Sequence, residues 1–289
     1  MQQRLISAAV LVPVVVIVFL LGPPVLTLGV ALLAALAAYE TTVLVRKAGL
    51  NSSPWLPVVA APAFVIGFAW VVGPERFPTA WTIVAPGVAL VLLLAAILGF
   101  RQRDPADGFR TWAGTSFASL YPSMLAFVSA FVGLWAVSQD GRLFGYALDT
   151  GRLLVLFLVL TVWTLDSAAY VAGRYHGRGR FMNHISPNKT WSGAIGGTLA
   201  AVVVATILFA AMGRSPIGGA LLGLVVAIFA QAGDLAESML KRAAGAKDSG
   251  TLIPGHGGFL DRVDSFLFAA PAMYGALTIV SLLRAGGWM

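Results

Sequence analysis

The sequence contains no cysteine, and only 11% of its residues are charged. The absence of cysteine excludes disulfide bonds, thiolate zinc sites, iron–sulfur clusters and cysteine nucleophiles. A metal ion bound to this chain would therefore take its ligands from oxygen atoms or imidazole nitrogens. The scarcity of charge excludes an ordinary soluble domain, in which about 25% of the residues are charged.

Apolar residues make up 58% of the sequence and gather in long stretches. A helix needs about 20 such residues to cross the hydrocarbon core of a bilayer. The sequence therefore predicts an all-α, polytopic integral membrane protein. No internal repeat or low-complexity tract is found, so residues 1–289 are expected to form a single membrane domain. A cleaved signal peptide is not expected, because Pro23 and Pro24 stand where a cleavage site would need small residues.

Nine apolar stretches are long enough to cross a membrane, so a helical bundle of about nine spans is predicted. The first two are separated only by Gly22, Pro23 and Pro24, and they form either two spans or a re-entrant hairpin. The stretches are Leu5–Leu21, Val25–Val45, Trp55–Val72, Ala80–Phe100, Trp112–Val137, Leu153–Ala172, Gly193–Met212, Ile217–Leu240 and Val263–Leu283.

Basic residues are distributed unevenly between the two sides of this bundle. Nine spans place the N-terminus and the loops around 46–54, 101–111, 173–192 and 241–262 on one side, which carries most of the 19 basic residues. The positive-inside rule predicts that this side, with the N-terminus, is cytoplasmic. The basic residues that give the chain its net charge of +7 lie in loops between apolar stretches, and no soluble basic domain is present to bind nucleic acid. Anionic lipid and nucleotide phosphates are therefore expected partners, and nucleic acid is not.

Three acidic residues, Asp166, Asp234 and Glu237, lie within or at the inner ends of apolar stretches. An ionised carboxylate there costs about 2.5 to 3.5 kcal/mol unless it is paired, so such residues are expected to be functional. Asp234 and Glu237 share one helix face, and Asp261 and Asp264 repeat the spacing. Carboxylate ligands suit Mg²⁺. Two structural explanations stay open: acidic residues that favour the helix dipole, and ordinary ion pairs within a helix.

The run Ser238–Asp264, between the last two apolar stretches, is unusually rich in charge and glycine. Its basic residues can bind phosphates, or they can anchor the chain at anionic headgroups. Its glycines allow the backbone to turn sharply and to approach a ligand closely. His256 lies between glycines, where it can donate to a phosphate or orient a metal-bound water. The charged residues and His256 are Lys241, Arg242, Lys247, Asp248, His256, Asp261, Arg262 and Asp264; the turn residues are Gly250, Pro254, Gly255, Gly257 and Gly258.

A second unusual stretch follows Asp166 and ends in a run of glycines. Ser186 and Pro187 form a helix start signal, and a helix N-terminus beside Lys189 and Thr190 is suited to anion binding. Lys189 shares its loop with further basic residues and is the stronger prediction for phosphate binding. The glycines that follow are expected to allow close packing of membrane helices. The basic residues are Arg174, Arg178 and Arg180, and the glycines are Gly193, Gly196 and Gly197.

Over its full length and in register, the run Ser238–Asp264 resembles the signature of the phosphatidate cytidylyltransferases, the CDP-diacylglycerol synthases. Asp166–Arg174 is similar to the family's D-x-x-A-Y-x-x-G-R element, and Ser186–Thr190 to its S-P-x-K-T element. The chain departs from the pattern at Asn188, where Lys is common, and at Trp191, where an acidic or amide residue is usual. Residues 1–150 match only in being hydrophobic.

The resemblance implies that CTP and phosphatidate react to CDP-diacylglycerol and pyrophosphate. It also implies a dinuclear metal site at Asp234 and Asp261 and association as a homodimer. Residues 1–150 would form a helical scaffold, and residues 151–289 the catalytic helices and cytoplasmic loops of a multi-pass protein of the cell membrane. Two other functions stay open: a CTP-dependent lipid kinase and an ion-coupled secondary transporter.

The residues and the resemblance together assign three groups. The metal ligands hold Mg²⁺, with a second monovalent or divalent cation allowed, and they are Asp234, Asp261 and Asp264. The catalytic residues are Asp234, Asp261, Lys241, Lys247, Asp248 and Arg262. The residues that bind CTP or phosphatidate are Asp166, Arg174, Ser186, Lys189, Thr190, Ser238, Arg242, His256, Gly257 and Gly258.

Overall fold

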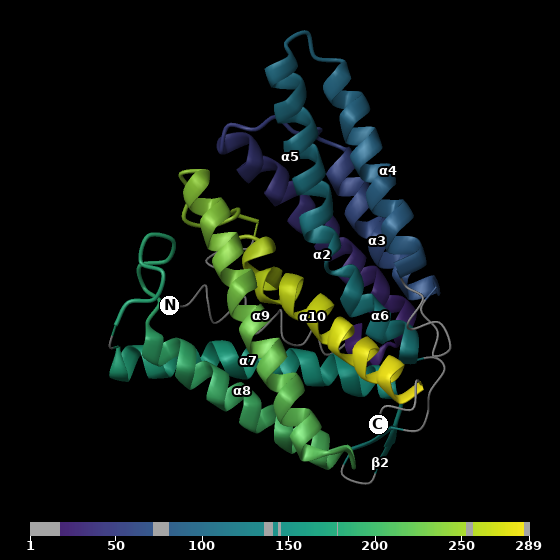
Figure 1. The fold of residues 1–289 in the computed structure, drawn as a ribbon, viewed down its shortest axis with the longest axis vertical. Helices are drawn as coiled ribbons and strands as arrows, with labels where there is room; N and C mark the ends of the chain where they lie inside the picture. The colour runs from purple at the N-terminus through teal and green to yellow at the C-terminus, as the bar shows by residue number, and fades with distance from the viewer. Residues whose placement is uncertain are drawn as a thin grey trace. The chain divides into compact units, whose positions relative to one another are not determined.

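The computed structural model describes residues 18–71, 81–135, 141–143, 146–177, 179–252 and 257–285. These residues form helices α2 to α10 and one hairpin of two short strands (Figure 1). The chain divides into two compact units. Unit 1 contains Met1–Val72, Thr79–Ala130 and Leu240–Val263, and unit 2 contains Gly73–Pro78, Phe131–Met239 and Asp264–Met289. The predicted division of roles at residue 150 stays a prediction.

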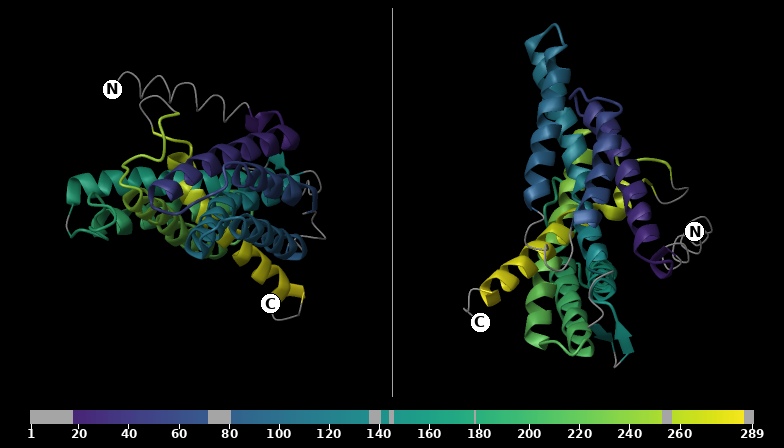
Figure 2. Two further views of the ribbon diagram at one scale, coloured as in Figure 1. Left: turned by 90° about the horizontal axis from the view of Figure 1, so that it is seen from above. Right: turned by 90° about the vertical axis from the view of Figure 1, so that its right-hand side faces the viewer.

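Unit 1 is built from the first helices of the chain. They are α2 (Pro23–Lys47), α3 (Leu56–Val71), α4 (Trp81–Phe100), α5 (Pro105–Ser123) and the first half of α6 (Ala126–Trp135). Pro23 and Pro105 begin α2 and α5, positions where proline loses no helical hydrogen bond. Helices α4 and α5 lie side by side as a hairpin (Figure 2). Glycine allows this close approach, because a Cβ on Gly99 would lie 2.7 Å from the carbonyl oxygen of Gly108.

Unit 2 contains the hairpin of β1 (Gly141–Leu143) and β2 (Tyr146–Leu148) and the long helices that follow. These are α7 (Thr150–His176), α8 (Trp191–Ala211), α9 (Pro216–Ala243) and α10 (Leu260–Ala285). The boundary between the units falls within α9 and within α10. Asp149 caps α7 by accepting a hydrogen bond from the Arg152 amide at 2.7 Å. The predicted all-helical architecture is confirmed for the described residues, apart from the short hairpin.

Within the described residues, six helices are long and apolar enough to cross a membrane. The predicted first stretch, Leu5–Leu21, lies largely outside the described residues. Two shorter apolar helical segments are Leu56–Trp70 in α3 and Val84–Phe100 in α4. The predicted span Trp112–Val137 overlaps the candidate span Pro105–Val132, which begins earlier than predicted. The chain is already helical from Pro105, and α5 gives way to α6 just after Pro122. The count of about nine spans and the orientation of the N-terminus stay predictions. The six helices are Pro23–Lys47, Pro105–Val132, Thr150–Tyr175, Trp191–Ala211, Pro216–Ala243 and Leu260–Leu283.

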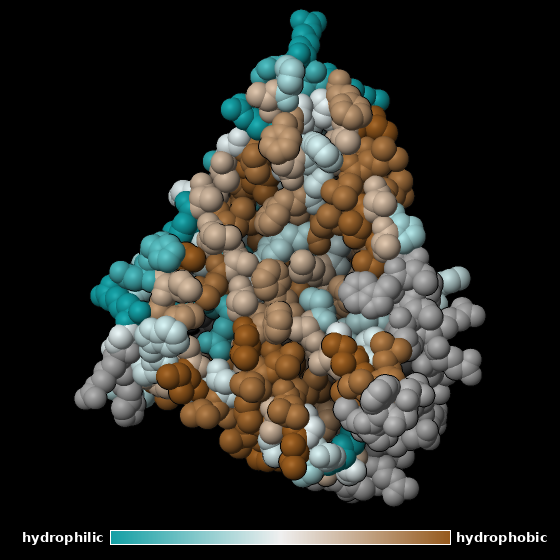
Figure 3. All heavy atoms as spheres, viewed as in Figure 1, coloured by the Kyte–Doolittle hydropathy of each residue, from teal (hydrophilic) through white to brown (hydrophobic). Residues whose placement is uncertain are grey.

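Large apolar side chains cover much of the surface visible in Figure 3. On α8 they form a stripe of Ile195, Leu199, Val203 and Ile207, and each of these side chains is more than half exposed. An exposed stripe of this size at helical spacing is unfavourable in water and favourable in a bilayer. The surface therefore agrees with the composition in indicating a membrane protein.

Small residues bring α7 and α8 into close contact. A Cβ on Gly193 would lie 2.9 Å from the carbonyl oxygen of Ala169, and a Cβ on Gly196 would lie 2.7 Å from Cβ of Ala172. The prediction that these glycines allow close packing of helices is confirmed.

Replacing Gly197 with alanine is expected to destabilise the protein by about 1 to 3 kcal/mol, the usual cost of overpacking. The added Cβ would lie 2.8 Å from the carbonyl oxygen of Leu165 and 2.9 Å from Cβ of Ala169. The control is Gly275→Ala on α10, where a Cβ meets nothing within 4 Å and alanine should stabilise the helix by about 0.5 to 1 kcal/mol. Thermal unfolding in detergent measures both. Equal shifts for the two variants would contradict the packing explanation.

Candidate active site

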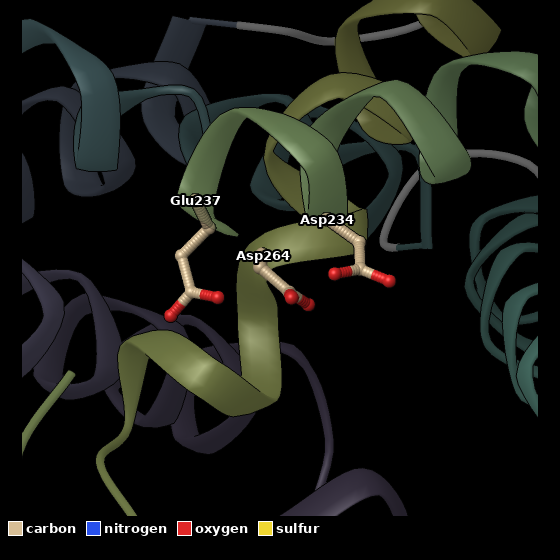
Figure 4. Close-up of side chains that lie close together, drawn as sticks. All are labelled: Asp234, Glu237 and Asp264. Carbon is tan, nitrogen blue, oxygen red and sulfur yellow. The ribbon is translucent and has the colours of Figure 1, made fainter. Parts of the chain in front are cut away.

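Three carboxylates gather where α9 and α10 meet in unit 2. Asp234 and Glu237 belong to α9, Asp264 belongs to α10, and one oxygen from each lies within 4.8 Å of the others. In the view of Figure 4 the Asp264 carboxylate lies between the other two. Glu237 is fully buried, whereas Asp234 and Asp264 are half-buried. The three side chains therefore form one acidic cluster that is partly open to ligands.

Two features of the sequence bring these carboxylates together. The spacing of three residues places Asp234 and Glu237 on one face of α9. Gly233 then lets α10 approach closely, because a Cβ there would lie 2.5 Å from the carbonyl oxygen of Asp264. A larger residue at this position would push the Asp264 segment of α10 away from α9. The cluster thus depends on a glycine next to a ligand as well as on the acidic residues.

The donor set of the acidic cluster fits a hard divalent cation. Three carboxylates offer oxygen ligands only, which suit Mg²⁺, an ion that usually binds through one or two carboxylates and substrate phosphates. Like charges at this separation repel one another, and a bound cation offsets that repulsion. Asp234 and Asp264 were predicted as metal ligands, and Glu237 was noted in the sequence but not assigned.

A lysine from the loop between α7 and α8 reaches the acidic cluster. Lys189 Nζ forms an ion pair with Asp234 Oδ2 at 2.8 Å. Asp166 on α7 interacts electrostatically with both Asp234 and Lys189, and Ser238 Oγ donates a hydrogen bond to Asp234 Oδ1 at 3.4 Å. The structure therefore brings together four residues that were predicted from two separate motifs.

The start of α8 differs from the prediction. Ser186 and Pro187 were expected to begin a helix, but α8 begins at Trp191, and Thr190 caps it by accepting a hydrogen bond from the Gly193 amide at 3.1 Å. Ser186 instead lies in a turn, where its carbonyl oxygen accepts from the Lys189 amide at 3.2 Å. This turn holds Lys189 just before the helix N-terminus.

A second cluster, in unit 1, is centred on Asp261. Its Oδ1 pairs with Lys241 Nζ at 2.6 Å, and both side chains are little exposed, at 11% and 12%. Its Oδ2 accepts hydrogen bonds from the Ser249 amide at 2.9 Å, the Ser249 hydroxyl at 2.8 Å and the Gly258 amide at 2.8 Å. One carboxylate oxygen thus binds the end of α9, and the other binds the segment that joins α9 to α10. The prediction that Asp261 is also a metal ligand stays a prediction.

The other predicted residues lie as follows, and their roles stay predictions. Arg174 donates to the Tyr170 hydroxyl at 3.1 Å, and Arg242 donates to the Ala246 carbonyl at 3.0 Å. His256 lies outside the described residues. Gly257 has a φ of 78°, which favours glycine. The exposed residues of this group are Arg174, Arg242, Lys247, Asp248 and Arg262.

The sequence analysis missed one buried acidic residue, Glu40 on α2. Its side chain is 2% exposed, and it accepts hydrogen bonds from the Ser249 hydroxyl at 3.0 Å, the Phe259 amide at 3.1 Å and the Leu260 amide at 2.8 Å. The available signal was a carboxylate inside the predicted stretch Val25–Val45, the same signal that identified Asp166.

Comparison with known proteins agrees with the family resemblance found in the sequence. The sequence model of the cytidylyltransferase family matches residues 2–280. A phosphatidate cytidylyltransferase of Brucella suis biovar 1 (strain 1330) is 50% identical over 126 residues, which cover 43% of this chain and 46% of that protein. The phosphatidate cytidylyltransferase of Bacillus subtilis (strain 168) is 43% identical over 134 residues, or 45% of this chain and 49% of that protein. The matched segments thus span about half the length of these relatives.

Proposed function

Because the chain belongs to the cytidylyltransferase family, we propose that it transfers a cytidylyl group from CTP to phosphatidate and releases pyrophosphate. The observation that carries this proposal is the acidic cluster of Asp234, Glu237 and Asp264, with Lys189 paired to one of its members. Carboxylates at the inner ends of apolar helices, with the Lys189 ammonium group held beside them, suit a reaction between a nucleotide and a membrane lipid.

The reaction joins one phosphate of the lipid to the α-phosphorus of the nucleotide. An oxygen of the phosphatidate headgroup attacks that phosphorus, and the bond to the β-phosphate breaks, so pyrophosphate leaves with the electron pair. The attacking oxygen is already anionic near neutral pH, so no strong general base is needed. Catalysis then depends on positioning the two phosphates and on neutralising their charge.

We assign the acidic cluster to metal binding. Asp234, Glu237 and Asp264 would hold Mg²⁺, and Asp261 is retained as a predicted metal ligand. When bound, the ion would neutralise charge on phosphate oxygens during transfer. Asp166, close enough to interact with Asp234 and Lys189, would orient Lys189.

The basic residues are assigned to phosphates. Lys189 and Lys241 are each held by a carboxylate, which fixes the position of the ammonium group before substrate binds. Ordered cations of this kind stabilise developing charge better than mobile ones, because they need not reorganise during the reaction. Asp248 would orient the neighbouring cations. The remaining phosphate contacts are assigned to Arg242, Lys247 and Arg262, and further contacts with substrate to Arg174, Ser186, Thr190, Ser238, His256, Gly257 and Gly258.

The setting of the reaction follows from topology. With the N-terminus cytoplasmic, the loop that carries Lys189 and the end of α9 that carries Lys241 would face the nucleotide pool, while the apolar helices would admit phosphatidate from the cell membrane. A homodimer is proposed on the family resemblance.

The test of this function is pyrophosphate release by the purified protein in lipid-supplemented detergent. We expect release only when CTP, phosphatidate and Mg²⁺ are all present, and its loss when a chelator is added. Product analysis should find CDP-diacylglycerol. A phosphorylated lipid with CDP would indicate a kinase instead, and uptake of an ion or solute without pyrophosphate release would indicate a transporter.

A further inference from the structure

The buried Glu40 carboxylate connects α2 to the segment that joins α9 and α10. Its three hydrogen-bond donors lie more than 200 residues away in the sequence. Two of them, the amides of Phe259 and Leu260, stand at the N-terminus of α10, where backbone amides have no helical acceptor. Glu40 therefore caps α10 from another helix.

The joining segment is shaped to fit this carboxylate. A Cβ on Gly250 would lie 2.5 Å from Glu40 Oε1, and a Cβ on Gly258 would overlap both Glu40 and the Ser249 hydroxyl. Two of the glycines that the sequence assigned to close approach of a ligand thus make room for a side chain of the protein itself. The segment thus lies against Glu40 at Gly250 and again at Gly258.

Ser249 links Glu40 to Asp261. The Ser249 hydroxyl lies 3.0 Å from Glu40 Oε2 and 2.8 Å from Asp261 Oδ2, so it bridges the two carboxylates. Asp261 in turn pairs with Lys241 at 2.6 Å. The hydroxyl has one proton to donate, and the two carboxylates share it. A substitution of Glu40 is therefore expected to alter the positions of the Asp261 and Lys241 side chains.

We propose that Glu40 is a positioning residue for cytidylyl transfer: it fixes Ser249 and the first turn of α10, and through them the Lys241–Asp261 pair. The inference rests on the proposed function, in which Lys241 binds a phosphate, and it assigns that phosphate to the nucleotide. Glu40 itself is buried and is assigned no contact with substrate. It acts by keeping the Lys241 ammonium group and the Asp261 carboxylate in place before CTP binds. Less conformational entropy is then lost when CTP binds.

The first experiment replaces Glu40 with glutamine, which keeps the volume of the side chain. One carboxylate oxygen becomes an amide NH₂ group, which cannot accept the hydrogen bonds that this oxygen accepts in Glu40. We expect KM for CTP to rise about 10- to 100-fold, the range seen when a residue that orients a ligand-binding group is removed. KM for phosphatidate should stay within about twofold, since the proposal assigns the Lys241–Asp261 pair to the nucleotide and not to the lipid. A protein that had merely lost stability would show no such selective change.

The control is Thr41→Val on the same helix. Thr41 is fully buried, and its hydroxyl donates to the Ala37 carbonyl of its own helix at 2.7 Å. This variant removes a neighbouring buried hydrogen bond without touching the α9–α10 segment, so both KM values should stay near those of the unsubstituted protein. Equal kinetics for Glu40→Gln and Thr41→Val would overturn the proposal.

A second measurement does not depend on activity. Because the chain has no cysteine, Thr251→Cys introduces a single thiol in the exposed part of the segment, where a nitroxide label can be attached. Glu40→Gln should narrow the electron paramagnetic resonance lines of this label, whereas Thr41→Val should not. Unchanged spectra in Glu40→Gln would overturn the inference. If the unsubstituted protein released no pyrophosphate, the proposed function would fail, while these spectra would still test whether Glu40 fixes the segment.

Ser249→Ala keeps the proposal testable if Glu40→Gln does not fold. It removes the bridge between the two carboxylates and leaves the amide hydrogen bonds to Glu40 in place. We expect a selective rise of about tenfold in KM for CTP, at the low end of the range for such groups. An unchanged KM would overturn the proposal.

Discussion

Replacing Asp264 with asparagine is expected to lower the rate of pyrophosphate release by about 10³-fold. A metal ion that neutralises phosphate charge contributes several kcal/mol to transition-state stabilisation, and each 1.4 kcal/mol or so corresponds to a tenfold change in rate. Asparagine keeps the size of the side chain and the oxygen that accepts the Ser265 amide at 2.6 Å. The fold should therefore persist while the charge that binds the cation is lost.

The measurement is the rate of pyrophosphate release as a function of Mg²⁺ concentration. In Asp264→Asn the concentration for half-maximal rate should rise, and Glu237→Gln should behave in the same way, because both belong to the acidic cluster. The control is Asp107→Asn, which removes an exposed carboxylate paired with Arg110 at 3.1 Å. A Mg²⁺ dependence that is identical in Asp264→Asn and in the control would refute the assignment of the cluster.

Helix positions could be predicted from the sequence because they depend on local features. The apolar stretches gave α7 to α10 within a few residues at most ends, since length and composition decide where a membrane helix lies. The break between α5 and α6 was missed, because no charged residue interrupts the predicted stretch Trp112–Val137 and hydropathy alone does not register a change of helix. Thr190 was likewise not recognised as the cap of α8, since Ser186 offered an equally good start signal four residues earlier.

The acidic cluster was predicted only in part. Helical spacing placed Asp234 with Glu237 and Asp261 with Asp264, but it could not decide which carboxylates of the two helices meet. That choice depends on how α10 packs against Gly233, and the packing register is a tertiary property. The structure groups Glu237 with Asp234 and Asp264, a combination that the sequence left open.

The hydrogen-bond partners of Glu40 could not be predicted from the sequence. A carboxylate within an apolar stretch signals a function or a partner, but nothing in the sequence names that partner. The donors lie more than 200 residues further along the chain, and two of them are backbone amides, which carry no signature in the sequence. Long-range contacts of this kind become visible only in three dimensions.

Lys241→Met is expected to reduce kcat/KM for CTP by about 10²- to 10³-fold, the usual effect of removing one preorganised group that stabilises developing charge. Methionine keeps most of the length of the side chain without its charge. Breaking a buried ion pair often costs about 3 to 5 kcal/mol of stability when the partner is left uncompensated. Here the cost should be smaller, because Asp261 Oδ2 keeps three donors from Ser249 and Gly258. The loss should therefore appear in activity more than in folding.

The matched control is Lys47→Met at the end of α2, an exposed position that removes the same charge from the same unit. Its effect on kcat/KM should be small, since an exposed charge acts only through screened electrostatics. Lys241→Arg should recover activity only in part, because the guanidinium is larger and planar and the pair is nearly buried. If Lys241→Met retained the activity of Lys47→Met, the pair with Asp261 would be structural, and the phosphate-binding role would pass to other cations of the chain.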